Sequence, residues 1–152
     1  MSEIHTEFLF NLDIEIGSRH NVGATPFGHR TIAHVTGGRF EGPQVQGTVL
    51  PGSGDWPLLS ADGGIRIDAR LTLRTHDSEL IYMTYQGLRS APPEIIERLS
   101  RNEPVDPSLY YLRIAPMFEA AAAQYRWLNY MLAVGTGRRV PGGLAYAVHR
   151  VL

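Results

Sequence analysis

The chain has 152 residues, of which 43% are hydrophobic and 19% charged; its formal net charge is −1 and it has no cysteine. That length predicts a single domain, residues 1–152, able to bury its own core. The near-neutral charge gives no indication of a nucleic-acid-binding surface. The absence of cysteine excludes disulfides, thiolate nucleophiles and cysteine-ligated zinc. All fourteen basic residues are arginine, which excludes a lysine Schiff base and a Walker lysine.

The opening stretch MSEIHTEFLF lacks the basic-then-apolar order of a signal peptide. No run of about eighteen apolar residues follows that would span a membrane as a helix. We therefore expect a cytoplasmic protein with neither membrane nor nucleic acid as a partner.

The dominant hydrophobic period is two, which indicates β-strands. The first expected strand is 7–15, followed by 28–38 and by 39–50, where Pro43 indicates an edge or a bulge. The clearest alternation falls within 64–75. Its apolar face holds Ile65, Ile67, Ala69, Leu71 and Leu73, and its polar face holds Arg66, Asp68, Arg70, Thr72 and Arg74.

Further strands are expected along the second half of the chain, at 79–87, 109–115, 125–135 and 144–152. Two short helices interrupt them. The first is 92–102, with proline at its start, and the second is 115–125, which contains four consecutive alanines. Many short antiparallel strands predict a barrel or a sandwich. Because closure removes edge strands, we expect a mainly β fold, an antiparallel closed β-barrel of about eight strands.

Five segments carry a resemblance to a known family: GGRFEGPQVQGTVLPGSGDW, IDARLTLRT, IYMTYQGLR, YYLRIAPMFE and YRWLNYMLAVG. In this order they resemble the bacterial and fungal family known as domain of unknown function 3237, from about Phe8 to Arg150. The resemblance implies a compact barrel akin to those of allene oxide cyclase and dirigent proteins. Some fungal relatives are associated with cyclisation steps in polyketide pathways, so it also implies a cofactor-free cyclase or isomerase. Departures from the family pattern at 77–78, 113–114 and 119–120 weaken the transfer of a particular activity.

Four residues are candidates for catalysis: Asp68, Arg70, Tyr111 and Arg113. Asp68 and Arg70 lie two apart on one strand, so their side chains share a face. Inside a barrel, the acid would act as a base and the arginine would stabilise an enolate or a carboxylate. The alternative is a structural ion pair on a solvated outer face. Arg113 likewise shares a strand face with Tyr111, which would supply a hydrogen bond.

Four further residues are candidates for ligand binding: Asp55, Trp56, Trp127 and Asn129. Trp127 and Asn129 share a face of the expected strand 125–135 and would line an apolar pocket. Alternatively, Trp127 belongs to the core and Asn129 pairs with backbone. Asp55 and Trp56 follow a Gly-Ser-Gly turn and would face the rim of the pocket, although Asp55 is equally suited to an Asx-turn.

No metal or organic cofactor is expected, because the six histidines contain no His-x-His pair and no phosphate loop or nucleophile elbow occurs. The sequence therefore predicts a small-molecule-binding barrel. One interpretation is a cyclase or isomerase acting on a carbonyl- or carboxylate-bearing substrate; the other is a non-catalytic binding or oligomer-forming barrel. If the charged face of 65–73 points inward, its apolar face needs cover from outside, so we expect a homo-oligomer.

Overall fold

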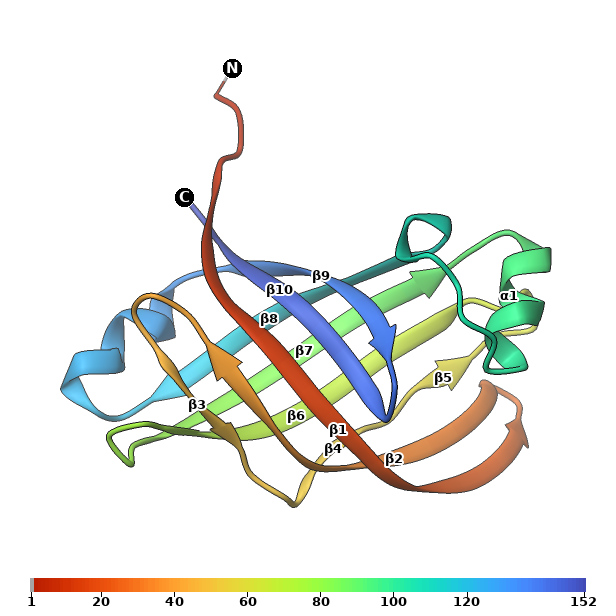
Figure 1. Ribbon diagram of the computed structural model, residues 1–152, viewed down its shortest axis with the longest axis horizontal. Coiled ribbons are helices and arrows are strands. Elements are labelled where there is room, and N and C mark those ends of the chain that lie inside the picture. The colour runs from red at the N-terminus through yellow and green to blue at the C-terminus, as the bar shows by residue number, and fades with distance from the viewer. Residues whose placement is uncertain (1) are drawn as a thin grey trace.

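The computed structural model describes residues 2–152, which form one ten-stranded antiparallel sheet with short helices at its ends (Figure 1). The strands are β1 (Thr6–Thr25), β2 (Gly28–Glu41), β3 (Gln46–Val49), β4 (Ser53–Asp55), β5 (Leu58–Leu59), β6 (Ile65–Thr75), β7 (Leu80–Ser90), β8 (Tyr111–Ala120), β9 (Ala133–Val140) and β10 (Gly143–Val151). The helices are α1 (Pro93–Ser100) and the 3₁₀ segments η1 (Pro107–Leu109) and η2 (Ala123–Tyr130). Within residues 2–152, no helix combines the length and the apolar character needed to cross a membrane.

Eight of the strands form a ring. β1 pairs with β10 on one side and with β2 on the other, so the order β1-β10-β9-β8-β7-β6-β3-β2 returns to its start. The short strands β3, β4 and β5 follow one another in the space between β2 and β6. This confirms the predicted antiparallel, mainly β fold. The two strands that the sequence did not predict are β4 and β5, in a stretch interpreted as loop.

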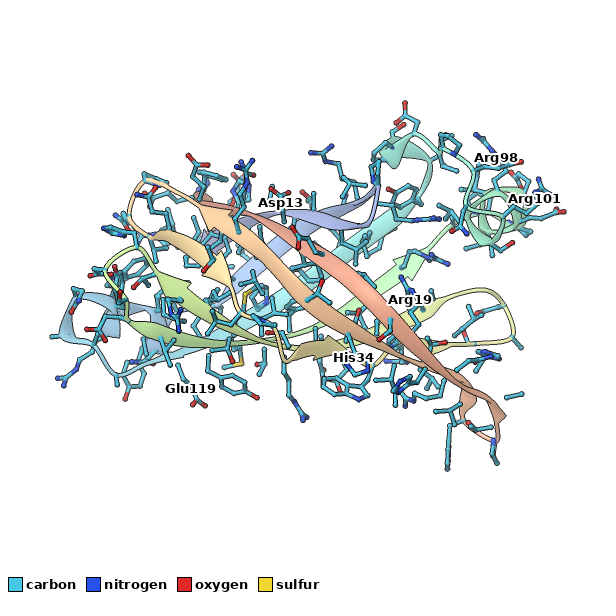
Figure 2. All side chains as sticks on the ribbon, turned by 60° about the horizontal axis from the view of Figure 1, so that its bottom comes forward. Asp13, Arg19, His34, Arg98, Arg101 and Glu119 are labelled. Carbon is cyan, nitrogen blue, oxygen red and sulfur yellow. The ribbon has the colours of Figure 1, made fainter. Side chains whose placement is uncertain are left out.

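The apolar face of β6 points into the ring. Ile67, Ala69 and Leu71 are at most 6% exposed, whereas Arg66 and Arg70 are exposed on the outside. Glu119 on β8 also points away from the interior, as Figure 2 shows. Burying unpaired guanidinium groups would cost several kcal/mol per ion, so the hydrocarbon takes the inside.

The interpretation that the charged face of β6 lines the interior is therefore wrong. Asp68 and Arg70 lie on the outer face of the ring. The homo-oligomer was predicted to cover an outward apolar face of this strand. That reason no longer holds, because the apolar face is buried inside the ring. The oligomeric state stays a prediction.

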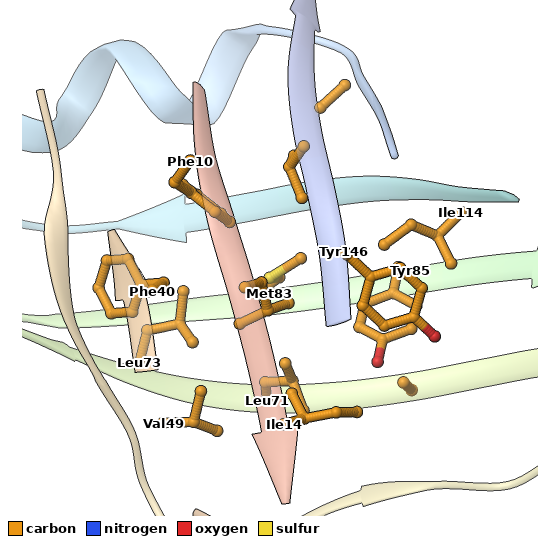
Figure 3. Close-up of a cluster of buried hydrophobic side chains, with 14 of the residues drawn as sticks. Phe10, Ile14, Phe40, Val49, Leu71, Leu73, Met83, Tyr85, Ile114 and Tyr146 are labelled. Carbon is orange, nitrogen blue, oxygen red and sulfur yellow. The ribbon is translucent and has the colours of Figure 1, made fainter. Parts of the chain in front are cut away.

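One half of the interior is filled with hydrocarbon. The ring of Phe10 meets those of Phe40 and Phe118 edge-on, with centroids 5.5 Å and 5.9 Å apart. Leu73 and Met83 pack in the same region (Figure 3) and are fully buried. Edge-to-face aromatic contacts add to the stabilisation that burial alone provides.

Helices lie at opposite ends of the sheet (Figure 1). α1 begins with proline in its first turn and buries Ile95 and Leu99, which confirms the helix predicted at 92–102. η2 packs at the other end, near the turn between β6 and β7. There the hydroxyl of Tyr125 donates a 2.6 Å hydrogen bond to Asp77.

Two predictions about the region before β9 are wrong. The segment expected as a helix at 115–125 is largely strand, because β8 extends to Ala120 and pairs with β7 along its length. Of the four alanines only Ala120 is paired in β8, whereas Ala121 and Ala122 connect it to η2, which begins at Ala123. The expected strand 125–135 begins as the helix η2, so Trp127 and Asn129 lie on a helix and do not share a strand face.

Replacing Phe10 by alanine should lower the free energy of unfolding by about 3–5 kcal/mol, because it removes a fully buried ring at the centre of the aromatic contacts. Phe8→Ala is the matched control: Phe8 lies on the same strand and is 39% exposed, against 1% for Phe10. Urea unfolding followed by fluorescence would measure both. Equal losses for the two variants would contradict this account of the core.

Candidate functional site

A single row of paired residues crosses the sheet beside the hydrocarbon core. It runs Arg19–Ala33–Asp55–Ala69–Tyr85, from β1 through β2, β4 and β6 to β7. Residues paired directly across antiparallel strands place their side chains on the same face. Since Ala33 and Ala69 are buried, this face is the interior. The row therefore brings an acid and a phenol into the ring, separated by the small side chain of Ala69.

Asp55 reaches the interior because the short strand β4 is held on both sides. Its residues Ser53 and Asp55 are each 5% exposed. The hydroxyl of Ser53 donates to the carbonyl of Leu50 (2.9 Å) and accepts from the amide of Thr72 (3.0 Å). The amide of Trp56 then donates to the carbonyl of Asp68 (2.9 Å). Asp55 is thus placed inside the ring, not at its rim as the sequence suggested.

Tyr85 on β7 and Tyr146 on β10 meet inside the ring. Their ring centroids are 5.6 Å apart, and the side chains are 1% and 2% exposed. Figure 3 shows them side by side, away from Phe40. Tyr146 lies flat against Gly137, where an added Cβ would fall 2.5 Å from its ring. We call Asp55, Tyr85 and Tyr146 the interior polar cluster.

None of these three side chains is fully satisfied. Oδ1 of Asp55 is buried and has no hydrogen-bond partner within residues 2–152. The hydroxyls of Tyr85 and Tyr146 are buried as well, and they interact with each other but with no further polar group in the same range. Buried polar atoms are nearly always fully paired, so a carboxylate oxygen without a partner beside two phenols that have only each other needs an explanation.

Burial shifts the titration of the interior polar cluster. It raises the pKa of Asp55 from 3.8 to about 6, a rise that the backbone amide of Asp68 and the charge of Arg19 partly offset. Burial also raises the pKa of both tyrosines, and the nearby charge of Asp55 adds to the rise. At neutral pH the phenols are therefore protonated donors, while the carboxyl gains and loses its proton near neutrality.

Sequence reasoning found Asp55 but missed Tyr85 and Tyr146. A signal existed: Tyr85 continues the inward series of Ile81 and Met83, and Tyr146 lies two residues before the inward Val148. A tyrosine at a position whose neighbours in the pattern are all apolar must bury its hydroxyl, which usually requires a partner.

Most of the residues predicted as a site gather elsewhere, on the outer face of the ring. Trp56, Asp68, Tyr111 and Arg113 line a groove of about 570 Å³ across β6, β7 and β8, which we call the outer groove. The guanidinium carbon of Arg113 lies 4.8 Å from the centroid of the Tyr111 ring.

Arg70 lines an adjoining groove, with its guanidinium carbon 5.7 Å from the centroid of the Trp56 ring. The ion pairs formed among residues 2–152 do not include one between Asp68 and Arg70. The pair of Asp68 and Arg70 predicted on this strand is therefore not formed.

Trp127 and Asn129 belong to neither place. The side-chain amide of Asn129 donates to the carbonyl of Ala120 (2.8 Å) and its oxygen accepts from the Ala120 amide (2.7 Å). The indole N–H of Trp127 donates to the carbonyl of Gln124 (3.1 Å). Asn129 fixes η2 against the end of β8, and the Trp127 bond lies within η2, at the end of the sheet opposite α1. The alternative interpretation, with Asn129 bound to backbone, describes their position.

Residues 2–152 contain no group of three or more histidine, aspartate or glutamate side chains arranged to hold a metal ion.

The chain belongs to the family described as protein of unknown function DUF3237, whose model matches residues 4–151. The UPF0311 protein RPA1785 of Rhodopseudomonas palustris is 32% identical over 149 residues, which cover 98% of this chain and 97% of the relative. The crystal structure of RPA1785, described as a conserved protein of unknown function, matches with a TM-score of 0.93 and 31% identity, covering 100% and 99% of the two chains.

Two further proteins extend the comparison. A β-barrel-like protein from Acinetobacter baumannii AYE matches with a TM-score of 0.88 and 31% identity, covering 100% of this chain and 98% of that chain. The hydroalkoxylation enzyme phnH of Penicillium herquei is 28% identical over 130 residues, which cover 86% of this chain and 72% of the enzyme. The family and the barrel-like fold expected from the sequence are thereby confirmed.

Asp55→Asn should stabilise the protein at pH 8 by up to about 3 kcal/mol and leave its stability unchanged near pH 4. The folded state binds the Asp55 proton more tightly than the unfolded chain, so wild-type stability falls as pH rises from about 4 to about 6. Each pKa unit is worth about 1.4 kcal/mol, and asparagine stays neutral throughout.

Urea unfolding at pH 4, 6 and 8 would measure the difference between variant and wild type. Asp68→Asn, on the outer face, is the control and should show no such pH-dependent gain. A difference for Asp55→Asn that does not change with pH would rule out a raised pKa at this carboxyl.

Proposed function

We propose that the protein is a cofactor-free acid–base enzyme that cyclises or isomerises a small substrate bearing a carbonyl or hydroxyl group. Asp55 moves the proton, and Tyr85 and Tyr146 donate hydrogen bonds to the substrate oxygen. The observation that carries the proposal is the interior polar cluster, in which Oδ1 of Asp55 has no hydrogen-bond partner within residues 2–152 and the two buried phenols have only each other.

The energetic cost of this cluster supports a role in function. Each buried polar group without a partner costs the folded state about 1–3 kcal/mol. A substrate oxygen placed between the two hydroxyls would accept hydrogen bonds from both. A substrate proton directed at Asp55 would satisfy its carboxylate. Substrate would thus supply the contacts that the folded chain lacks.

The protonation states suit proton-transfer chemistry. A general base works best when its pKa lies near the working pH, and the pKa of Asp55 is about 6. Because their pKa values are raised, Tyr85 and Tyr146 remain neutral donors and stabilise the negative charge that develops on an enolate or a phenolate.

A ring closure can then proceed without any oxidant or reductant. The Asp55 carboxylate takes the proton of a substrate hydroxyl, and the oxygen attacks a nearby electrophilic carbon of a C=C bond. The neighbouring carbon then takes the proton back from Asp55. One O–H and one C–C π bond are lost, one C–O and one C–H bond form, and the enzyme returns to its starting state.

The name of the fungal relative supports this reaction class. Hydroalkoxylation is the addition of an O–H group across a C=C bond, and the Penicillium herquei protein is named for it. An isomerase would use the same groups, with the proton returned to a different carbon of the same enolate.

A second candidate is a non-catalytic binding site in the outer groove. Its volume of about 570 Å³ and its walls of Trp56, Tyr111 and Arg113 suit a small aromatic ligand. In that case ligand would bind unchanged, and Trp56→Phe would weaken binding while Asp55→Asn would not.

The acid–base proposal is tested with phenols that carry a C=C bond conjugated to a ketone, such as 2′-hydroxychalcone, and with enolisable cyclic ketones, each incubated with the protein in D₂O. Ring closure or exchange at carbon introduces deuterium that NMR detects. Asp55→Asn should slow the wild-type reaction at least about 100-fold, the usual contribution of a general base. The wild-type kcat/KM should rise with pH through about 6, as the Asp55 carboxyl loses its proton.

Tyrosine variants supply a matched pair on one strand. Tyr85→Phe removes a buried hydroxyl of the interior polar cluster, whereas Tyr82→Phe removes an exposed hydroxyl on the other face of β7. Only the first should slow turnover. Activity that survives in Asp55→Asn, or that is lost equally in Asp68→Asn, would contradict the proposal.

A further inference from the structure

Two arginines face the interior beyond the interior polar cluster, on the side covered by α1. On β7, Tyr85, Gly87 and Arg89 occupy successive inward positions, and Arg89 pairs with the buried Leu112 of β8. On β9, Arg139 pairs with Leu144, which packs against the core. The side chains of both arginines therefore leave the backbone on the inner face of the ring.

Neither arginine has an acidic partner within residues 2–152. Arg139 donates to the carbonyl of Leu99 (2.8 Å) and to the side-chain oxygen of Asn102 (2.9 Å), both of them neutral. Nε of Arg89 is buried and has no hydrogen-bond partner in the same range. Burial and the charge of Arg139 lower the pKa of Arg89, so the two cations lie close enough to repel each other.

This arrangement differs from that of the arginines that bind carboxylates on the surface. Arg150 and Arg101, for example, form ion pairs with Glu7 and Glu97 at 2.6 Å and 2.8 Å. A partly buried cation without a counterion is costly, because breaking or omitting one partner leaves a charge uncompensated. Nε of Arg89 is unpaired and Arg139 is bonded only to neutral oxygens, so neither positive charge is compensated by an acid within residues 2–152.

The walls near the two arginines are apolar. Ile67, Leu112 and Ile114 are buried inward residues of β6 and β8. A ligand that satisfies the arginines therefore needs an apolar body as well as a charge. Arg89 lies four residues beyond Tyr85, about 13 Å along the strand, a distance that an acid with one or two rings would span.

We propose that Arg89 and Arg139 bind the carboxylate of an aromatic acid whose ring extends toward the interior polar cluster. A planar guanidinium group matches a carboxylate with two parallel hydrogen bonds. This names the substrate class, and its link to turnover rests on the proposed function. The carboxylate would be held apart from the reacting oxygen, which the tyrosines bind.

The probes are 1-naphthoate, its neutral analogue 1-naphthamide and inorganic phosphate. At pH 7.5 and low ionic strength, 1-naphthoate should raise the melting temperature saturably, and the amide and phosphate should do so far less. Calorimetric titration should show at least tenfold weaker binding of 1-naphthoate to Arg89→Gln, with amide binding unchanged. Arg74→Gln, an exposed arginine on the outer face of β6, is the matched control and should bind like wild type.

Folding of the variants is not an obstacle. Arg89→Gln removes an uncompensated charge, so the free variant should melt no lower than wild type. Arg89→Lys keeps the charge and loses the planar pair of donors, and it should bind with intermediate affinity. The proposal would be overturned if phosphate bound preferentially, if acid and amide bound equally, or if neither bound. It would also be overturned if Arg89→Gln bound 1-naphthoate as tightly as wild type.

The Asp55→Asn variant separates this inference from the proposed function. It removes a negative charge and should bind 1-naphthoate at least as tightly as wild type. If Asp55 proves irrelevant to turnover, acid binding at Arg89 still stands. If Arg89 proves irrelevant to acid binding, the role of Asp55 in proton transfer still stands.

Discussion

Strand pairing across β6 is the constraint on which the interior of this protein depends. β6 pairs with β3, β4, β5 and β7, and paired residues share a face. Once hydrocarbon burial turns Leu71 and Leu73 inward, Ala69 is also inward, and its partners Asp55 and Tyr85 follow. A slip of one residue would exchange the two faces. The same register therefore builds the core and delivers an acid to its edge.

The interior is consequently divided into two parts with different properties. The phenylalanine cluster fills one part and stabilises the ring. The other part contains hydroxyl, carboxyl and guanidinium groups that are not fully paired within the described chain. Protein folds usually depart from local rules where function requires it. Because both parts belong to one continuous set of strands, the stabilisation from the well-packed aromatic part can offset the cost of the unpaired polar groups in the other part.

Local sequence pattern was enough to predict most of the strands, from hydrophobic alternation, and the helix α1, from its early proline. It could not predict β4, whose three residues become a strand only by pairing with β2 and β6. The helix predicted at 115–125 failed for a similar reason, because its first six residues pair with β7, a contact that local propensity does not contain. Each tyrosine could have been placed inside from its own strand. Their meeting could not, because Tyr85 and Tyr146 come from strands far apart in the sequence.

The separation between the arginines and Asp55 has a chemical rationale. A guanidinium group in direct contact with the carboxylate would lower its pKa by about 1–3 units and weaken it as a base. Arg19 lies two strands away in the same row and only partly offsets the effect of burial. Arg89 lies four residues beyond Tyr85, with Gly87 between them at the inward position. Burial therefore dominates at Asp55 and keeps its pKa at about 6. Under the proposals above, this separation would let one interior hold an anionic ligand at the arginines without weakening the carboxylate as a base.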